Sequence, residues 1–444
     1  MTFQIFNRRT LIANQPTPNP LNGFITFNTN DQELITDLLN IDQQNAIGLR
    51  IYNTGTEYAT LVVENPDIMW EKLGSPILAD PTEFFGTSVS LSSDGTRVVI
   101  GSGGGGVDPP YARIYEYTAS PVAGWNQLGG DISDGLASTV TSPSVSISAD
   151  GTRVAIGFVM AAATAGTTKV YEYSAPNWTQ VGVNINGEAA ADQSGWSVSL
   201  NIDGTILAIG SNPATVGSLS YTKIYQYSNP SWAQIGQNID GEIAGDGSGR
   251  SVSLNSDGTR VAIGAPYFGS TALGYVRVYE YSSTPSPLWS KVGNNIVGDN
   301  NDDDFGYSVS LDSSGTRIAI GAPGSAYTRI YEYTTSWTQL GEDITNTLPN
   351  SQSGYSVSLN DDGTRVVIGD PSDVEGASPL GGSVKVYDYT TEWSQAGQSI
   401  LGQTPLTRVG SGVSLNGDGD KMVVGVNSIT PISSTVKIYE SVIV

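Results

Sequence analysis

Carboxylates are the side chains best placed to do chemistry in this sequence. Its 444 residues include 43 Asp and Glu against 20 Lys and Arg, for a net charge of −23, and they include no His and no Cys. The absence of both residues excludes Ser-His triads, thiol nucleophiles, disulfides and metal sites held by imidazole or thiolate. Glycosidases need only two carboxylates, but no pair of acids stands apart from the repeated positions. We therefore expect a protein that is not an enzyme.

The densest group of acids lies between residues 299 and 304. Calcium takes about six to eight oxygen ligands, so Asp299, Asp302, Asp303 and Asp304 form a candidate calcium site. The alternative is a solvated acidic loop, which we favour because the equivalent loops of the other repeats hold fewer acids. No other metal and no cofactor is expected.

Other charges recur at fixed positions in two phrases, approximately S-V-S-L-x-x-D-G-T-R-V-A-I-G and [K/R]-[V/I]-Y-[E/Q/D]-Y. In neighbouring antiparallel strands, the Arg of the first phrase faces the acid of the second. One copy has Ile206 and Gln226 instead, and this joint loss of both charges favours ion pairs over a ligand site. Each exposed pair contributes only ~0.2–1 kcal/mol, so the pairs set register more than stability. The predicted structural pairs are Arg97–Glu116, Arg153–Glu172, Arg260–Glu280, Arg317–Glu332, Arg365–Asp388 and Lys421–Glu440.

The phrases belong to a repeat with a mean spacing of about 54 residues, present in seven copies, each with a third segment W-x-x-φ-G (φ apolar or Ala). These segments are short, rich in Val, Ile, Tyr and Trp, and separated by Gly, Asp, Asn and Ser, as strands and turns are. Four strands in each of seven units predict an all-β fold, a seven-bladed β-propeller with four antiparallel strands per blade. A linear β-solenoid is the alternative.

The phase of the repeats predicts how the ring closes. A W segment at Trp70 precedes the first repeat, whereas none follows the last Y-E segment. We expect Trp70–Gly74 to pair beside Val436–Glu440, with Trp70 near Tyr439, so that an N-terminal strand completes the last blade and two open sheet edges disappear. The predicted propeller covers residues 67–444.

Residues 1–66 do not follow the repeat and are predicted to form a small β-rich domain. This domain either packs on the ring or serves as an anchor or oligomerisation module, and we favour the anchor. Its predicted elements are strands at Phe3–Phe6, Phe24–Asn28, Leu49–Asn53 and Tyr58–Val63, a short helix at Asp31–Leu39 and a loop at Gln15–Asn22.

The segment Phe305-Gly306-Tyr307-Ser308, followed by Gly321-Ala322-Pro323, resembles an FG-GAP repeat, the unit of integrin-α-type propellers. The resemblance covers about residues 70–444 and implies a seven-bladed propeller that acts in adhesion or recognition. The S-V-S-L phrase is more loosely similar to repeat propeller proteins of large algal DNA viruses and marine microbes. FG-GAP calcium loops carry several acids before the second strand, whereas Leu91–Gly95 and Leu254–Gly258 carry one each, so D-G predicts a turn here.

These patterns favour a structural or recognition protein, in its most concrete form a virus-particle surface, minor capsid or fibre component. Its propeller would bind a host protein or glycan, and its N-terminal domain would join the particle or another protein assembly. Nucleic acid is not an expected partner, because so acidic a surface repels phosphate. The alternatives are a carbohydrate-active enzyme with paired carboxylates, although sialidase-type S-x-D-x-G-x-x-W boxes are absent, and an intracellular propeller scaffold, although W-D and G-H dipeptides are missing.

The same patterns bear on where the protein acts. No apolar run reaches the ~20 residues of a membrane-spanning helix. The first ten residues lack the layout of a secretory signal. We expect a virion surface, or an extracellular location after release by another route, with the cytoplasm as the alternative.

Overall fold

The computed structural model describes five strands within residues 1–67, and residues 68–79, 83–103, 109–120, 122–135, 142–159, 165–213, 218–267, 273–300, 302–348, 350–374, 381–428 and 434–443. The chain divides into two compact units. One comprises Met1–Trp70 with Ser441–Val444, and the other comprises Glu71–Glu440.

The N-terminal strands form two small antiparallel sheets. One contains β1 (Phe3–Ile5) and β2 (Leu11–Ala13), and the other has the order β3 (Phe24–Asn28), β5 (Tyr58–Val63), β4 (Leu49–Asn53). The prediction of a β-rich region is confirmed, with β2 as a strand that the sequence pattern did not indicate. The helix predicted at residues 31–39 and the loop predicted at residues 15–22 lie outside the described residues.

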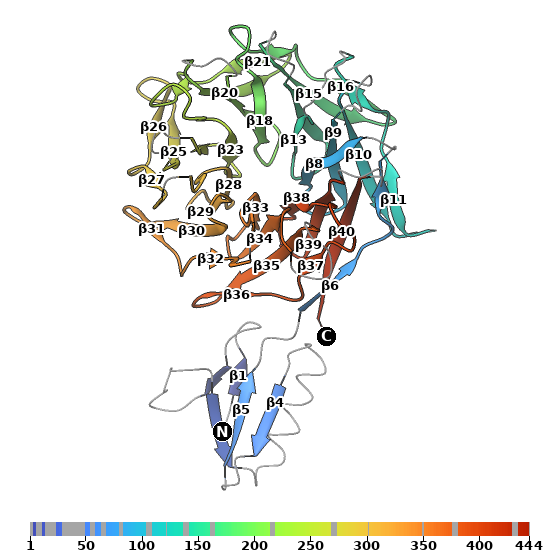
Figure 1. Cartoon of the computed structure of the whole chain (residues 1–444), viewed down its shortest axis with the longest axis vertical. Coiled ribbons are helices and arrows are strands. Elements are labelled where there is room, and N and C mark those ends of the chain that lie inside the picture. Colours follow the sequence, from blue (N-terminus) through green and yellow to red (C-terminus); the bar gives the residue numbers. More distant parts are fainter. Residues whose placement is uncertain are drawn as a thin grey trace. The chain divides into compact units, whose positions relative to one another are not determined.

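The second unit, together with residues 68–70 and 441–443, forms a seven-bladed β-propeller, as predicted (Figure 1). Each blade is an antiparallel sheet of four strands, and the inner strands surround the centre of the ring. From the inner to the outer strand, blade 1 is β8 (Phe84–Leu91), β9 (Arg97–Gly103), β10 (Tyr111–Thr118) and β11 (Gly124–Gln127), and blade 2 is β13 (Ser144–Ile147), β14 (Arg153–Phe158), β15 (Thr167–Ser174) and β16 (Asn177–Gln180). Blade 3 is β18 (Ser194–Leu200), β19 (Ile206–Ser211), β20 (Tyr221–Ser228) and β21 (Ser231–Gln234), and blade 4 is β23 (Ser251–Leu254), β24 (Arg260–Ala265), β25 (Tyr275–Ser282) and β26 (Leu288–Lys291).

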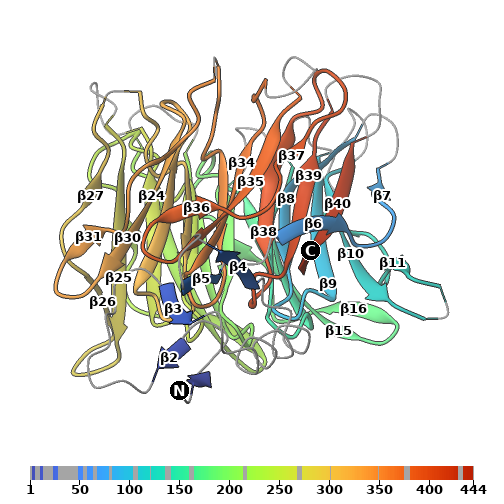
Figure 2. The ribbon, with the colours of Figure 1, turned by 90° about the horizontal axis from the view of Figure 1, so that it is seen from below.

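The remaining blades repeat this plan, and their strands likewise run between the two ends of the ring (Figure 2). Blade 5 is β28 (Ser308–Leu311), β29 (Arg317–Ala322), β30 (Tyr327–Tyr333) and β31 (Trp337–Gln339), blade 6 is β33 (Ser356–Leu359), β34 (Arg365–Asp370), β35 (Ser383–Tyr389) and β36 (Trp393–Gln395), and blade 7 is β38 (Val409–Leu415), β39 (Lys421–Val426), β40 (Thr435–Ile443) and β6 (Ile68–Lys72). A two-residue strand also pairs with the third strand of each blade: β12 (Ile132–Ser133), β17 (Ile185–Asn186), β22 (Ile239–Asp240), β27 (Ile296–Val297), β32 (Ile344–Thr345), β37 (Ile400–Leu401) and β7 (Ile77–Leu78).

Blade 7 contains the predicted closure. Strand β6 lies beside β40 in the sheet, the Leu73 amide donates to the Ile438 carbonyl oxygen at 2.8 Å, and Ile77 of β7 is in register with Val436. Trp70 and Tyr439 are both buried. The N-terminal strand therefore completes the last blade, and the ring has no open sheet edge at that point.

The hydrophobic core lies between neighbouring blades. In blade 4 the second strand is buried along Val261–Ala265, because a blade packs against sheets on both faces, whereas the inner strand alternates half-buried Ser with buried Val and Leu. One cluster joins Ala208 and Ile224 of blade 3 to Val261 and Trp289 of blade 4. Each hydrophobic cluster is thus built from side chains of two neighbouring blades.

The W-x-x-φ-G segment forms an inter-blade joint. The Trp289 Nε1 donates to the Ile235 carbonyl oxygen of blade 3 at 3.0 Å. A β-carbon at Gly236, where φ is 71°, would lie 2.6 Å from Trp289 Cδ1, so this glycine makes room for the ring. The same indole-to-carbonyl bond links Trp125 to Leu73, Trp178 to Leu128, Trp232 to Val181, Trp337 to Val292 and Trp393 to Leu340.

The second serine of S-V-S-L forms another joint, which closes around the whole ring. In each case its hydroxyl oxygen accepts a hydrogen bond from a backbone amide of the next blade, at 2.9–3.3 Å. The amide and serine pairs are Ile147–Ser90, Leu200–Ser146, Leu254–Ser199, Leu311–Ser253, Leu359–Ser310, Leu415–Ser358 and Leu91–Ser414.

Candidate functional site

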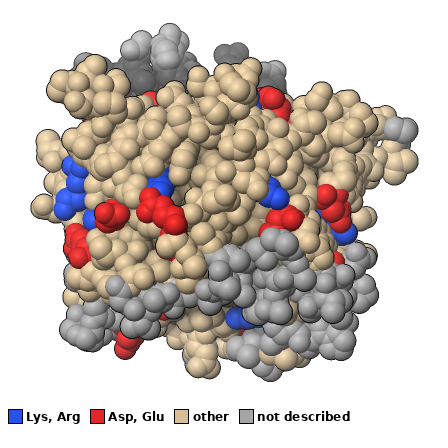
Figure 3. Space-filling model, turned by 90° about the horizontal axis from the view of Figure 1, so that it is seen from above, with Lys and Arg blue, Asp and Glu red and all other residues tan. Residues whose placement is uncertain are grey.

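The arginine and acid of each repeat face one another across strands two and three, in the register Arg97↔Glu116 and its equivalents. Figure 3 shows such basic and acidic side chains side by side on a largely uncharged surface. The nitrogen–oxygen distances are 2.7 Å for Arg97–Glu116, 3.2 Å for Arg153–Glu172, 2.9 Å for Arg260–Glu280, 2.8 Å for Arg317–Glu332, 2.5 Å for Arg365–Asp388 and 3.8 Å for Lys421–Glu440.

These arginines also reach the next blade, which the sequence reasoning missed. Arg97 Nη1 donates to the Gly151 carbonyl oxygen at 3.1 Å, and its guanidinium carbon lies 5.3 Å from the centre of the Tyr173 ring. In blade 3, Ile206 pairs with Gln226 in register and lies against Gly258, where the other blades have a cation. The repeated charges are therefore structural joints, and a binding site is expected at positions where the blades differ.

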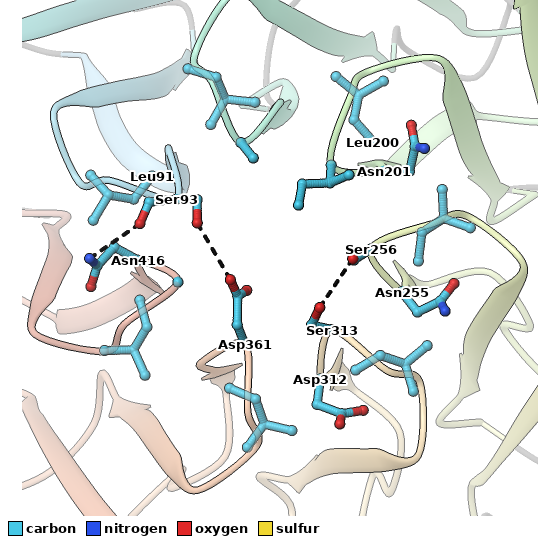
Figure 4. Close-up of a pocket in the computed structure, with 18 residues that line it drawn as sticks. Leu91, Ser93, Leu200, Asn201, Asn255, Ser256, Asp312, Ser313, Asp361 and Asn416 are labelled. Atoms are coloured by element: carbon cyan, nitrogen blue, oxygen red, sulfur yellow. Dashed lines mark hydrogen bonds between the residues drawn. The ribbon is translucent and has the colours of Figure 1, made fainter.

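One end of the central channel is encircled by the turns between strands one and two, through a ring of backbone hydrogen bonds that we call the annulus. Each amide donates to the equivalent carbonyl oxygen of the next blade at 2.9–3.1 Å, and the seventh bond returns to blade 1. The channel mouth at this end has a volume of about 150 Å³ and is lined from all seven blades (Figure 4). The annulus residues are Ser93, Ala149, Ile202, Ser256, Ser313, Asp361 and Gly417.

Asp361 brings a carboxylate into the annulus. Burial raises the pKa of Asp361, and the charges of Asp418 and Asp362 add to the rise. The Ser93 hydroxyl, which donates to Asp361 Oδ2 at 3.4 Å, partly opposes it. A β-carbon at Gly417 would lie 2.5 Å from Asp361 Oδ2. The glycine of the seventh copy thus makes room for this carboxylate, which is the annulus's single charged side chain.

Two of the four candidate calcium residues, Asp299 and Asp303, already have partners within the protein. Asp303 is buried, and it accepts hydrogen bonds from the Tyr327 hydroxyl at 2.9 Å, the Asn300 amide at 2.9 Å and the Ser325 hydroxyl. Asp299 forms an ion pair with Arg329. Within the described residues no group of three or more acids is placed to hold a metal. Our preference for a solvated loop is wrong for Asp303, because its neighbours replace water.

Asp303 is one copy of a pattern that the sequence reasoning missed, a carboxylate bonded to the first tyrosine of strand three. Asp192 accepts from Tyr221 at 2.9 Å and Asp246 accepts from Tyr275 at 2.7 Å, while Tyr111 donates to Glu83. The signal was present, because each acid stands three residues before the glycine that precedes the first S of its repeat. The acids anchor the loop at this end of the blade.

Blade 6 carries a variant of this pattern with two buried aspartates. Ser351 and Ser383 replace the acid and the tyrosine, and the Asn346 amide nitrogen donates to both Asp370 and Asp373 at 3.0 Å. Burial raises the pKa of Asp370, and the hydroxyl of Ser351 opposes that rise. Both aspartates are at most 2 % exposed, so this pair does not face solvent where a glycoside would bind.

The opposite end of the inner strands has side chains that differ from blade to blade. The residue directly before the first S of the repeat is Thr87, Pro143 or Ser411 in blades 1, 2 and 7. In the four consecutive blades 3 to 6 it is aromatic or cationic, and we call these four residues the arc: Trp196, Arg250, Tyr307 and Tyr355.

The arc side chains contact one another across blades. The guanidinium carbon of Arg250 lies 4.2 Å from the centre of the Tyr307 ring and 5.1 Å from that of Trp196. The Tyr307 and Tyr355 ring centres are 4.9 Å apart, with planes tilted by 44°. All four side chains are half-buried, and Tyr267, whose ring centre is 6.0 Å from Arg250, is 39 % exposed. The arc is thus a continuous surface of aromatic rings around one cation.

Arg250 of the arc differs from the repeated arginines of the joints, each of which forms an ion pair. In the described part of the chain no acid forms an ion pair with Arg250, and its buried Nε has no hydrogen-bond partner. Burial raises the pKa of the nearby Asp304; Arg250 opposes the rise, and Asp302 and Asp303 add to it. Burial also raises the pKa of Tyr307. Because its donors are not spent on a carboxylate, Arg250 can bind a ligand's oxygens.

The comparisons with known proteins support the fold. No protein-family model and no curated protein matches the sequence. Among solved structures, a hydrazine synthase chain from Kuenenia stuttgartiensis has a TM-score of 0.52 at 12 % identity, with 82 % of this chain and 98 % of that one covered. A functionally unknown protein from Desulfotomaculum acetoxidans has a TM-score of 0.46 at 10 % identity, with 80 % and 98 % covered. The first likeness supports the β-propeller fold of this chain and shows nothing of this chain's activity. The described residues contain no helix with the length and apolar character needed to span a membrane.

Proposed function

We propose that this chain is a non-enzymatic recognition protein that binds its ligand at the arc. The observation that carries the proposal is the contrast between joints and arc. The repeated residues bond one blade to the next, whereas the arc replaces small residues by half-buried aromatic rings around Arg250. Aromatic residues and arginine supply most of the binding energy where proteins meet ligands or partners.

In its most concrete form the proposal is an FG-GAP-type propeller on the surface of a virus particle, as a minor capsid or fibre component used in host attachment. The Phe305-Gly306-Tyr307-Ser308 wording and the viral likeness of the repeat phrase support this version. The N-terminal unit would fasten the propeller to the particle. A cytoplasmic propeller scaffold is the alternative, and in it the arc would bind an intracellular protein.

The location is tested by mass spectrometry of purified particles against the soluble lysate of the same cells. The protein should be enriched in particles together with known capsid proteins. Its presence in the soluble lysate alone would overturn the particle version. A panel of chromogenic glycosides tests the enzyme alternative, since turnover of any of them would contradict a non-enzymatic role.

A further inference from the structure

The arc combines two kinds of group that recognise different parts of one ligand. Its rings offer apolar faces that pack on C–H groups, and the planar side chains of Arg250 and Asp304 offer several donors and acceptors beside them. Arg250 is held between the rings of Trp196 and Tyr307, so the direction of its donors is fixed before a ligand arrives. A preorganised site of this kind loses little side-chain entropy on binding.

The local charges decide between classes of ligand. An anionic ligand would gain from Arg250 but would meet the acidic run at Asp302, Asp303 and Asp304. Burial raises the pKa of Asp304, and the charges of Asp302 and Asp303 add to that rise. A cationic ligand would gain from those acids but would meet the guanidinium. An uncharged ligand rich in hydroxyl groups is repelled by neither, and hydroxyl groups both donate to carboxylates and accept from guanidinium.

We infer that the arc binds an uncharged glycan, with pyranose rings on those faces of Trp196, Tyr307 or Tyr355 that Arg250 does not cover, and with hydroxyl groups bonded to Arg250 and Asp304. The inference rests on the proposed recognition function and gives the class of its ligand. The arc spans four blades, so it offers room for more than one sugar unit. A short oligosaccharide should therefore bind more tightly than a monosaccharide.

The test uses the full-length protein on an array of printed oligosaccharides, with uncharged glucose-, mannose- and galactose-based members beside sialylated, uronated and sulfated ones. The best uncharged member is then titrated by calorimetry against the wild type and variants. Arg250→Gln and Tyr307→Ala should each weaken binding about tenfold or more, the loss of ~1.4 kcal/mol expected for one stacked or charge-assisted contact. Tyr307→Phe keeps the ring and should lose less affinity than Tyr307→Ala.

The matched control is Thr87→Ala, at the equivalent position of blade 1, which should bind like the wild type. Circular dichroism and thermal melting verify that each variant is folded. Three outcomes would each overturn the inference: the protein prefers acidic glycans, the arc variants bind as tightly as the wild type, or no uncharged member of the array is bound. These results leave the particle experiment unaffected. Conversely, glycan binding by a protein absent from particles would remove only the particle version of the proposed function.

Discussion

The two ends of the inner strands differ in how regularly the blades repeat. At the annulus, the seven turns, six D-G and one S-G, bond to one another through their backbones, and most side chains there are small. At the arc, the equivalent residues of the seven blades range from Pro143 and Ser411 to Trp196 and Arg250. Backbone bonding allows each blade to carry the same phrase, whereas side-chain contacts at the arc depend on which blade supplies them. Repetition therefore marks what joins the blades, and departures from it mark a surface that can bind a ligand.

The largest effect is expected where a repeated residue joins two blades. Trp289→Ala removes a fully buried ring and its bond to the Ile235 carbonyl oxygen, and it should lower the free energy of unfolding by about 3–5 kcal/mol. Urea unfolding followed by far-UV circular dichroism measures it. The adjacent Leu288→Ala, at an exposed site, should change stability by less than about 0.5 kcal/mol. Equal losses in the two variants would break the assignment of the tryptophans to the joints.

A smaller loss is expected within the annulus. Gly417→Ala places a β-carbon 2.2 Å from the Ser93 Oγ and 2.5 Å from the Asp361 Oδ2, and it should cost about 1–3 kcal/mol. Adding Asp361→Ala should recover part of that loss, since the two sites share one space. Gly130→Ala, whose β-carbon would meet nothing within 4 Å, is the matched control. If the stability loss of the double variant equals the sum of the losses of the two single variants, the two side chains do not share one space and the prediction is wrong.

The arc should tolerate change that the joints do not. Tyr355→Ser installs the residue type found in blade 7 and removes one half-buried ring from the pair with Tyr307, so we expect a loss of about 1 kcal/mol or less. Thermal melting measures this loss, and calorimetry with the array's best glycan measures binding, which should weaken. A melting temperature lowered as far as that of Trp289→Ala would show that the arc is a structural joint as well.

The smallest effects concern the pH dependence of aspartates at the D-G turns. Burial raises the pKa of Asp361 above its unfolded value, so the native state binds the extra proton, and stability falls as pH rises through that interval. Asp361→Asn should therefore stabilise the protein at pH 7 by no more than about 1 kcal/mol. The gain should vanish below the unfolded pKa.

Asp94 provides the opposite sign at an equivalent turn. Burial raises the pKa of Asp94, but hydrogen bonds from Ser92 and Thr96 outweigh burial and leave the pKa lowered. Its stabilisation is present above the unfolded pKa and is lost as pH falls through the folded one. Asp94→Asn should thus lower stability at neutral pH, by less than about 1 kcal/mol. Urea titrations of both variants at pH 7 and pH 3 measure the two slopes, and slopes of the same sign would refute the distinction.

The fold could be predicted from the sequence because the repeat occurs seven times in it. The phase of Trp70 predicted closure by β6. The antiparallel order of strands two and three predicted that Ile206 faces Gln226, as it does in the structure. The inter-blade reach of Arg97 did not follow, because a pattern within one repeat gives pairing inside a blade and says nothing of the distance to Gly151 in the next.

The sequence analysis did not predict the arc, for the same reason. Its four residues lie more than 45 positions apart in sequence and differ in type, so periodic reasoning treats each as a departure from the consensus. Asp303 shows the converse difficulty. Its dense acidic surroundings predicted exposure, whereas its spacing before Gly306, shared with Asp246 before Gly249, was the informative signal of burial.

The closing strand sets an order of assembly during synthesis. Strand β6 leaves the ribosome before any complete blade, because residues 68–72 precede all seven inner strands. Its partner β40 (Thr435–Ile443) follows the other six blades. Until then β40 in the last sheet and the lone strand β6 each expose an edge that can pair with a neighbouring chain. Loop closure over so many residues is slow compared with hairpin formation. A translation pause or a chaperone that protects β6 should thus decide how much nascent protein becomes a monomeric ring and how much aggregates.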